Sequence, residues 1–114
     1  MAVTDLKDTI LGIMKDLAID NRIVVGAIGA DELAINHWIT GASFPQHEKR
    51  ARLQALLDVR DHALDTFDTA EAAHSWMHAD NRSLSGLSPA DVLLAGRVDR
   101  VEAALTVLDS GMFI

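Results

Sequence analysis

The residues of this sequence that could carry chemistry are two histidines, a pair of glycines and many carboxylates. His74 and His78 are one helical turn apart and Asp80 follows them, which is a spacing that could hold a metal ion. No third ligand stands at a fixed spacing from this pair, and histidines on an alanine-rich helix are common, so we expect no metal. The segment 26–29, GAIG, lacks the strand, the third glycine and the lysine of a phosphate-binding loop. No Gly-x-Ser-x-Gly motif occurs either. We therefore expect a protein that is not an enzyme and uses no cofactor.

The composition narrows the class of protein further. The chain has 114 residues, of which 49% are hydrophobic, and a net charge of −7. The absence of cysteine excludes a disulfide scaffold and thiol-bound zinc. No long uncharged stretch could cross a bilayer, and the first residues carry acids without a signal-peptide pattern, so we expect a cytoplasmic chain with no membrane partner. The acidic balance opposes long-range attraction to nucleic acid.

These residues must be positioned by helices, because apolar residues recur every three or four positions throughout and only two prolines occur. Asp68 and Glu71 have the spacing of a capping box that opens a helix. Ser88 and Pro89 form a second helix start, which a hydrophobic staple between Leu87 and Val92 would close. Glycines 29, 41, 96 and 111 end helices. The sequence predicts an all-α fold of seven helices, the first four at about Thr4–Leu17, Asn21–Ile28, Asp31–Thr40 and Gln46–Asp65.

We divide the chain at residues 66–69 into two parts, 1–66 and 67–114. The first part carries ten acidic and seven basic residues, which gives a net charge of −3. The second carries seven acidic and three basic residues, which gives −4. Neither part is basic.

Within the first part, residues 21–38 are similar to the helix-turn-helix of phage-repressor-like (Xre) regulators. A glycine falls at the turn, where a positive φ is needed, and apolar residues occupy the positions that lock two short helices together. These residues are Gly29, Val24, Ile28, Ala30, Ile35 and Trp38. The resemblance predicts a degenerate, Xre-like helix-turn-helix in the N-terminal part.

The face that this motif would present to DNA is acidic at its start. Asp31 and Glu32 would lie near phosphates and weaken binding. Asn36 and His37 could read base edges. The phosphate contacts that we predict are Arg22, Lys49, Arg50 and Arg52. For Lys49 to Arg52, a solvated start to a long helix is an equally good interpretation.

The second part carries the most specific pattern in the chain, at residues 76–111. A Trp at a helix end is followed by Asn-x-x-Leu-x-Gly-x-Ser-Pro-x-Asp-x-Leu, then by a glycine, a valine and a final glycine. These positions are Trp76, Asn81, Leu84, Gly86, Ser88, Pro89, Asp91, Leu93, Gly96, Val101 and Gly111. The pattern resembles the toxin-binding domain of the Xre/MbcA/ParS antitoxins, which follows a degenerate helix-turn-helix in that family.

The resemblance implies a type II antitoxin, the partner of a RES-domain toxin that consumes NAD. Such an antitoxin blocks the nucleotide site of its toxin and also represses its own operon, best when it is complexed with toxin. The resemblance therefore implies the cognate toxin as a partner, with operator DNA as a further partner of the complex. This chain departs from the family pattern at Asp31 and Glu32, where small polar and basic residues are usual. These are the positions on which autoregulation by DNA contact would depend.

The last residues of the chain favour a protein partner independently of the resemblance. Met112, Phe113 and Ile114 follow Gly111, and they either pack on their own core or contact a partner. Arg97, Arg100 and Glu102 lie on the polar side of the last helix, as rim contacts or as solvated side chains. We expect Trp76 and Leu84 in the core, and Asn81 and Asp91 bracing the loop and the helix start.

Three functions follow from these patterns. The first is an antitoxin that binds through its C-terminal part and forms a homodimer or a higher hetero-oligomer through its N-terminal helices. The alternative is a stand-alone transcriptional regulator that uses the C-terminal part for oligomerisation. A small metal-binding or ligand-sensing protein is the third.

Overall fold

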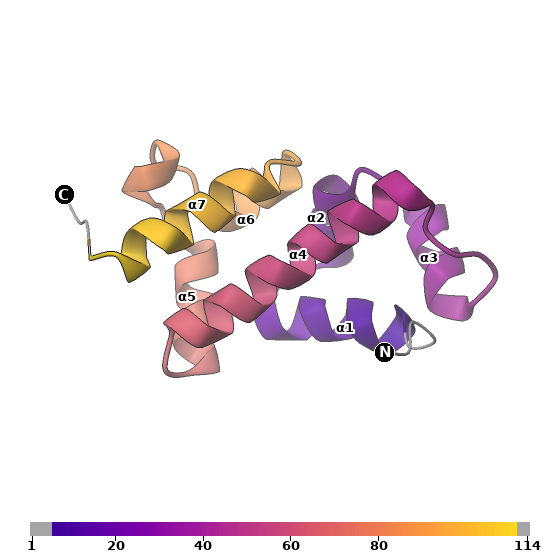
Figure 1. Ribbon diagram of the computed structural model, residues 1–114, viewed down its shortest axis with the longest axis horizontal. Helices are drawn as coiled ribbons and strands as arrows, with labels where there is room; N and C mark the ends of the chain where they lie inside the picture. Colours follow the sequence, from indigo (N-terminus) through magenta and orange to yellow (C-terminus); the bar gives the residue numbers. More distant parts are fainter. Residues whose placement is uncertain (1–5, 112–114) are drawn as a thin grey trace.

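The protein is built from helices alone in the range that the computed structural model describes, residues 6–111 (Figure 1). This confirms the all-α prediction, and the described part measures 46 × 25 × 21 Å. The α-helices are α1 (Leu6–Leu17), α2 (Asn21–Ile28), α3 (Glu32–Thr40), α4 (His47–Thr66), α5 (Ala70–His78), α6 (Pro89–Leu94) and α7 (Val98–Asp109), with a short 3-10 helix, η2 (Arg82–Leu84), before α6. Thr4, the expected cap of the first helix, lies outside the described residues. Between residues 6 and 111, no helix is long and apolar enough to cross a membrane.

One predicted helix start is wrong. Helix α5 is capped by Thr69, whose side chain accepts from the Ala72 amide at 3.1 Å, so the capping position is one residue later than Asp68. The backbone at Thr69 is extended, as a cap requires, and the helix begins after it. Before α6, Leu87 is 52% exposed, and its predicted staple with Val92 stays a prediction. Its carbonyl accepts from the Asn81 amide at 3.0 Å, and this backbone bond holds Leu87 in the loop.

One hydrophobic core runs through both predicted parts of the chain. Helix α4 lies along the middle of the molecule, with α1 on one side and α7 on the other (Figure 1). Ile10, Leu17 and Leu56 of the N-terminal part belong to the same buried cluster as Leu93 and Leu105 of the C-terminal part. The division at residue 66 falls at the end of α4 and stays a prediction.

The two parts of the chain approach each other closely at Gly26 in α2. A Cβ atom at this position would lie 2.1 Å from the carbonyl oxygen of Leu94, at the end of α6. Two backbones can meet this closely only where one of them carries no side chain. The glycines of the segment 26–29 therefore have structural roles: Gly26 admits α6, and Gly29 ends α2 with a φ of 76°.

Candidate functional site

The loop between α5 and α6 is held by the residues of the C-terminal pattern. The Asn81 side chain accepts from the Ser83 amide at 2.8 Å, and its backbone carbonyl accepts from the Gly86 amide at 2.9 Å. Gly86 has a φ of 86°, which lets the chain turn there. Leu84 is 2% exposed, and its side chain anchors the loop by packing in the core. These contacts confirm the expected bracing role of Asn81 and the core position of Leu84.

The same pattern sets the start of α6 and the position of Trp76. The Ser88 hydroxyl accepts from the Asp91 amide at 3.1 Å, and Pro89 occupies the first turn of the helix. Asp91 contributes this amide, while its own side chain is exposed. Trp76 is half-buried, with its ring centroid 5.7 Å from that of Phe67. The motif residues therefore build a fixed platform beneath α7.

Helix α7 and η2 border a shallow groove of about 230 Å³. Its lining includes Ser83, Asp99, Arg100 and Val107. Arg100 is exposed there, and Arg97 is bonded to Asp99 at 3.0 Å. The hydrogen bond from Arg97 lowers the pKa of the Asp99 carboxyl. The groove thus presents charged side chains beside apolar ones, as the rim of a protein interface does.

Glu102 has a structural contact that the sequence did not predict. Its carboxylate pairs with Nδ1 of His62 on α4, and Nε2 of His62 lies 2.5 Å from Oδ2 of Asp109. Thr66 donates to the other Asp109 oxygen at 2.8 Å. Glu102 therefore forms an ion pair between α7 and α4 while its side chain stays 41% exposed, and its expected place at the rim of an interface stays a prediction. Two carboxylates seven residues apart share one side of a helix, but this spacing does not reveal the partner on α4.

The far end of α7 leads towards the apolar tail. Asp109 is the last helical residue, and Gly111 follows with a φ of 73° and is exposed. Met112, Phe113 and Ile114 lie outside the described residues. Their predicted contact with a partner stays a prediction.

At the opposite end of the molecule, α2 and α3 are locked together as the sequence predicts (Figure 1). Val24, Ile28, Ile35 and Trp38 are at most 5% exposed, and Ala30 is 9% exposed. The two acids at the start of α3 have structural roles. Asp31 caps the helix by accepting from the Ala34 amide at 2.8 Å, and Glu32 accepts from Nδ2 of Asn21 at 3.2 Å.

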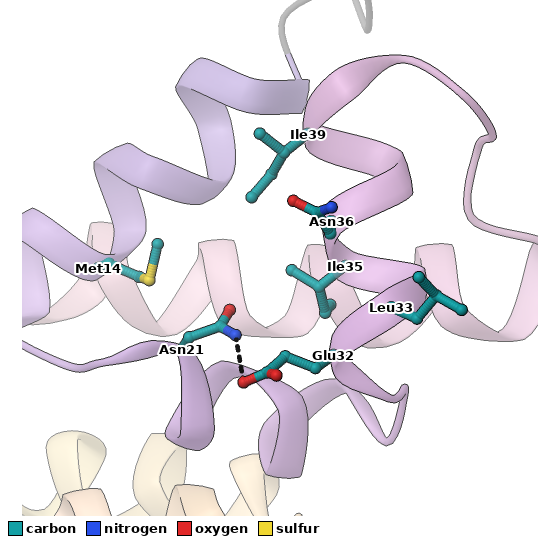
Figure 2. A pocket seen from close by; sticks show the side chains of 7 residues that line it. All are labelled: Met14, Asn21, Glu32, Leu33, Ile35, Asn36 and Ile39. Atoms are coloured by element: carbon teal, nitrogen blue, oxygen red, sulfur yellow. Dashed lines mark hydrogen bonds between the residues drawn. The ribbon is translucent and has the colours of Figure 1, made fainter.

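The outer surface of α3 is more apolar than a DNA-reading helix would be. Figure 2 shows a groove of about 530 Å³ between α1 and α3, lined by Met14, Asn21, Glu32, Leu33, Ile35, Asn36 and Ile39. Leu33 is 62% exposed, and Asn36 and His37 are exposed too. Asn36 therefore borders an apolar hollow.

Two of the predicted phosphate contacts lie beside the turn before α3. Nζ of Lys49 and Nη1 of Arg52, both on α4, come within 3.6 and 3.7 Å of the Cβ position that Gly29 lacks, and they form a local basic strip. Arg52 is also 3.9 Å from Glu48. Arg22 on α2 and Arg50 on α4 are exposed, and none of the four basic residues lies on α3.

His74 and His78 bind backbone carbonyls. Nε2 of His74 donates to the Asp16 carbonyl at 3.0 Å, and Nε2 of His78 donates to the Ala18 carbonyl at 2.6 Å. Both carbonyls lie at the end of α1, where helical partners run out. Among residues 6–111, no group of three histidine or carboxylate side chains is arranged so that it could hold a metal ion. The spacing of one helical turn thus serves to dock α5 on α1.

This chain is similar to known antitoxins. A family model for the antitoxin Xre/MbcA/ParS C-terminal toxin-binding domain matches residues 62–111. The mycobacterial cidal antitoxin MbcA of Mycobacterium tuberculosis (strain ATCC 25618 / H37Rv) is 30% identical over 114 residues, which cover 100% of both chains. The probable mycobacterial cidal antitoxin Rv3188 of the same strain is 26% identical, over 92% of this chain and 89% of its own.

A solved structure matches the fold over nearly the same length. A chain of the crystal structure of the M. tuberculosis MbcT–MbcA toxin–antitoxin complex superposes with a TM-score of 0.68, at 28% identity. The match covers 96% of this chain and 97% of that one.

These similarities define the class of protein as a small helical antitoxin. The chain belongs to the Xre/MbcA/ParS family of antitoxins.

Proposed function

We propose that this chain neutralises a cognate RES-domain toxin, which degrades NAD, by covering the entrance to its active site. The observation that carries the proposal is the full-length similarity to MbcA, whose fold was solved in complex with the toxin MbcT. Steric inhibition needs only an interface that closes the substrate entrance. The proposal puts both proteins in the cytoplasm.

The interface that we propose consists of α7, the adjoining groove and the chain end after Gly111. Arg97 and Arg100 are exposed on α7, next to the groove lined by Asp99 and Val107. Glu102, which pairs with His62, contributes by supporting α7 from within. Apolar side chains at the centre of a small interface supply most of its binding energy, so Met112, Phe113 and Ile114 would be the anchors.

The test is co-expression with the product of the adjacent reading frame. We expect the chain to co-purify with that protein, to restore growth and to stop NAD consumption. Deleting residues 112–114 should weaken inhibition at least tenfold while leaving the thermal unfolding midpoint unchanged, because the deletion removes contacts to the partner only. His47→Ala, at an exposed position at the start of α4, is the control and should inhibit normally. An unchanged inhibition constant for the shortened chain would refute the role of the tail.

Operon repression is a second proposed function, supported by the buried Xre-like contacts of α2 and α3. The DNA contacts would be Arg22, Asn36 and His37, with Lys49, Arg50 and Arg52 on phosphates. Because α3 lies at the opposite end of the molecule from the C-terminal end of α7, α7 could hold toxin while α3 meets an operator (Figure 1). A regulator that acts alone is the alternative, and it would shift operator DNA without toxin.

We also propose that copies pair through the N-terminal helices. The support is apolar exposure on this part: Leu11, Leu33 and Phe44 are 41%, 62% and 62% exposed. Leu33 also lines the groove between α1 and α3, and exposed apolar surface favours a protein contact. The mass of the purified complex in solution will give the number of copies of each chain.

A further inference from the structure

The strongest unassigned feature is the cluster that joins α4 to α7, made of His62, Thr66, Glu102 and Asp109. We call it the α4–α7 clamp. The His62 side chain is only 19% exposed, and each of its ring nitrogens faces a different carboxylate. Thr66, one turn further along α4, bonds the second oxygen of Asp109. The clamp thus connects the N-terminal part of the chain to the helix that is proposed to meet toxin.

The chemistry of the clamp requires a charged imidazole. Ionised carboxylates only accept hydrogen bonds, so both ring nitrogens of His62 must donate, and only the imidazolium has two N–H groups. A neutral ring would leave one lone pair facing a carboxylate. Oε1 of Glu102 is buried and accepts no bond from the described residues, so the positive ring is also the nearest compensation for that oxygen.

The electrostatics of the clamp support this charge state. Burial disfavours the charged ring, but the hydrogen bonds to Asp109 and then to Glu102 outweigh it and raise the pKa of His62. The same bond from His62, followed by the one from Thr66, lowers the pKa of Asp109.

The clamp acts at the end of α7. Asp109 is the last residue of the helix, and Glu102 lies two turns earlier on the same side. The two ion pairs therefore fix both the position and the rotation of the C-terminal half of α7.

We propose that His62 is a positioning residue for toxin binding, which holds the C-terminal half of α7 in place against α4. This inference rests on the proposed function, in which α7 meets the toxin. His62 itself touches no toxin. Its effect is to reduce the conformational freedom that α7 would lose on binding.

The other charged and titratable groups near this part of α4 are bonded to other partners or exposed to solvent. From α1, Asp16 is bonded by Arg60 at 3.1 Å, and Arg60 also holds Asp61. From α5, His74 and His78 bind α1 carbonyls. The other carboxylates on α1, α4 and α5 are exposed, namely Asp8, Glu48, Asp58, Asp65 and Glu71.

The sign of the pH dependence follows from the two pKa shifts. Because the pKa of His62 is raised in the folded protein, its contribution is complete below the ordinary value of 6.5 and disappears as the pH rises through the raised value. Because the pKa of Asp109 is lowered, its contribution persists down to acidic pH, below the ordinary 3.8. Toxin binding should therefore weaken on the alkaline side.

The test compares His62→Gln with His47→Gln, an exposed histidine at the other end of the same helix. The dissociation rate of the complex with the adjacent gene product is measured at pH 6 and pH 9. At pH 6, His62→Gln should dissociate about fivefold faster than the wild type, and the acceleration of the wild type at pH 9 should be absent from the variant. His47→Gln should follow the wild type at both pH values. Amide hydrogen exchange in residues 106–111 of the free protein should accelerate only in His62→Gln.

A role of His62 in stability alone would give a different pattern. In that case His62→Gln would lower the unfolding midpoint but keep the wild-type dissociation rate, or would keep the wild-type pH dependence, and either result overturns the proposal. If His62→Gln does not fold, Asp109→Asn, which removes one charge and keeps an oxygen for Thr66, must show the same loss of pH dependence. A wild-type chain that fails to capture the toxin at pH 6 would reject the proposed function, which is a distinct result.

Discussion

Short polar side chains at the helix starts account for much of the local order of this antitoxin. Asp20, Asp31, Thr69 and Ser88 each accept from a backbone amide in the first turn of the following helix. These amides have no helical partner, so each cap satisfies a group that would otherwise depend on water. Caps of this kind matter most for short helices such as α3 and α5, of nine residues each.

The cap of α5 can be tested against its neighbour. Thr69→Ala should lower the free energy of unfolding by about 1 kcal/mol, because it removes the acceptor of the Ala72 amide. Asp68→Ala is the matched control, and it should change stability by less than about 0.5 kcal/mol. Urea titration of both variants measures the difference. A larger loss for Asp68→Ala would show that the helix starts one residue earlier in solution.

At this scale the sequence predicts residue roles well where the contact is local. Ser88, Asn81 and Gly29 act within a few residues of themselves, and their types and spacing identify their roles. His74, His78 and His62 act across the fold, on α1 and α7. A histidine spacing fits a metal, a carbonyl or a carboxylate equally well, so only the tertiary neighbours decide between them.

Among the elements, the contact of α2 with α6 constrains the fold most tightly. The backbone of α6 at Leu94 fills the space where a side chain at position 26 would begin, and the Gly26 carbonyl lies 3.3 Å from the Cβ position of Gly96. Both contacts are between backbones, which cannot move aside as a side chain can.

Two glycine substitutions distinguish the effect of this backbone contact on stability from the effect of helix propensity. Gly26→Ala should destabilise the protein by about 2 kcal/mol or more, because the new methyl group overlaps the Leu94 carbonyl. Gly12→Ala in α1 should stabilise it by about 0.5–1 kcal/mol, since its Cβ would meet only Nη1 of Arg60, at 3.9 Å. Thermal unfolding of both variants tests the pair. A neutral Gly26→Ala would mean that α2 and α6 can separate at little cost.

The sequence predicts the elements of this fold more completely than their packing. The boundaries of α2 and α7 follow from apolar spacing and from Gly29 and Gly111. The pairing of α2 with α6 and of α4 with α7 could not be predicted, because every helix has an apolar side that could meet any other. A glycine at position 26 does not by itself predict close packing, because the sequence does not show that α6 lies beside it.

For the molecule as a whole, the net charge and the positions of the basic residues determine the affinity for DNA. With a net charge of −7, any affinity for DNA must come from the local basic strip at Lys49 and Arg52. The acids at the start of α3 oppose it, although Asp31 and Glu32 also hold the helix in place.

Reversing the charge at this position gives the corresponding prediction. Asp31→Ser with Glu32→Arg should strengthen non-specific DNA binding about tenfold at low salt and steepen its salt dependence. Serine retains a capping oxygen, so α3 should stay folded. Asp68→Ser with Glu71→Arg makes the same change in net charge at α5 and should have little effect. Equal gains for both pairs would mean that α3 does not face the DNA.

The shared core ties the lifetime of this protein to its global stability. Because Leu56, Leu93 and Leu105 belong to one cluster, a protease cannot unravel one half while the other stays intact. Digestion must wait for the whole chain to open, so the rate of turnover follows the unfolded population. A bound partner would lower that population, and inhibitor that has lost its target would be degraded first.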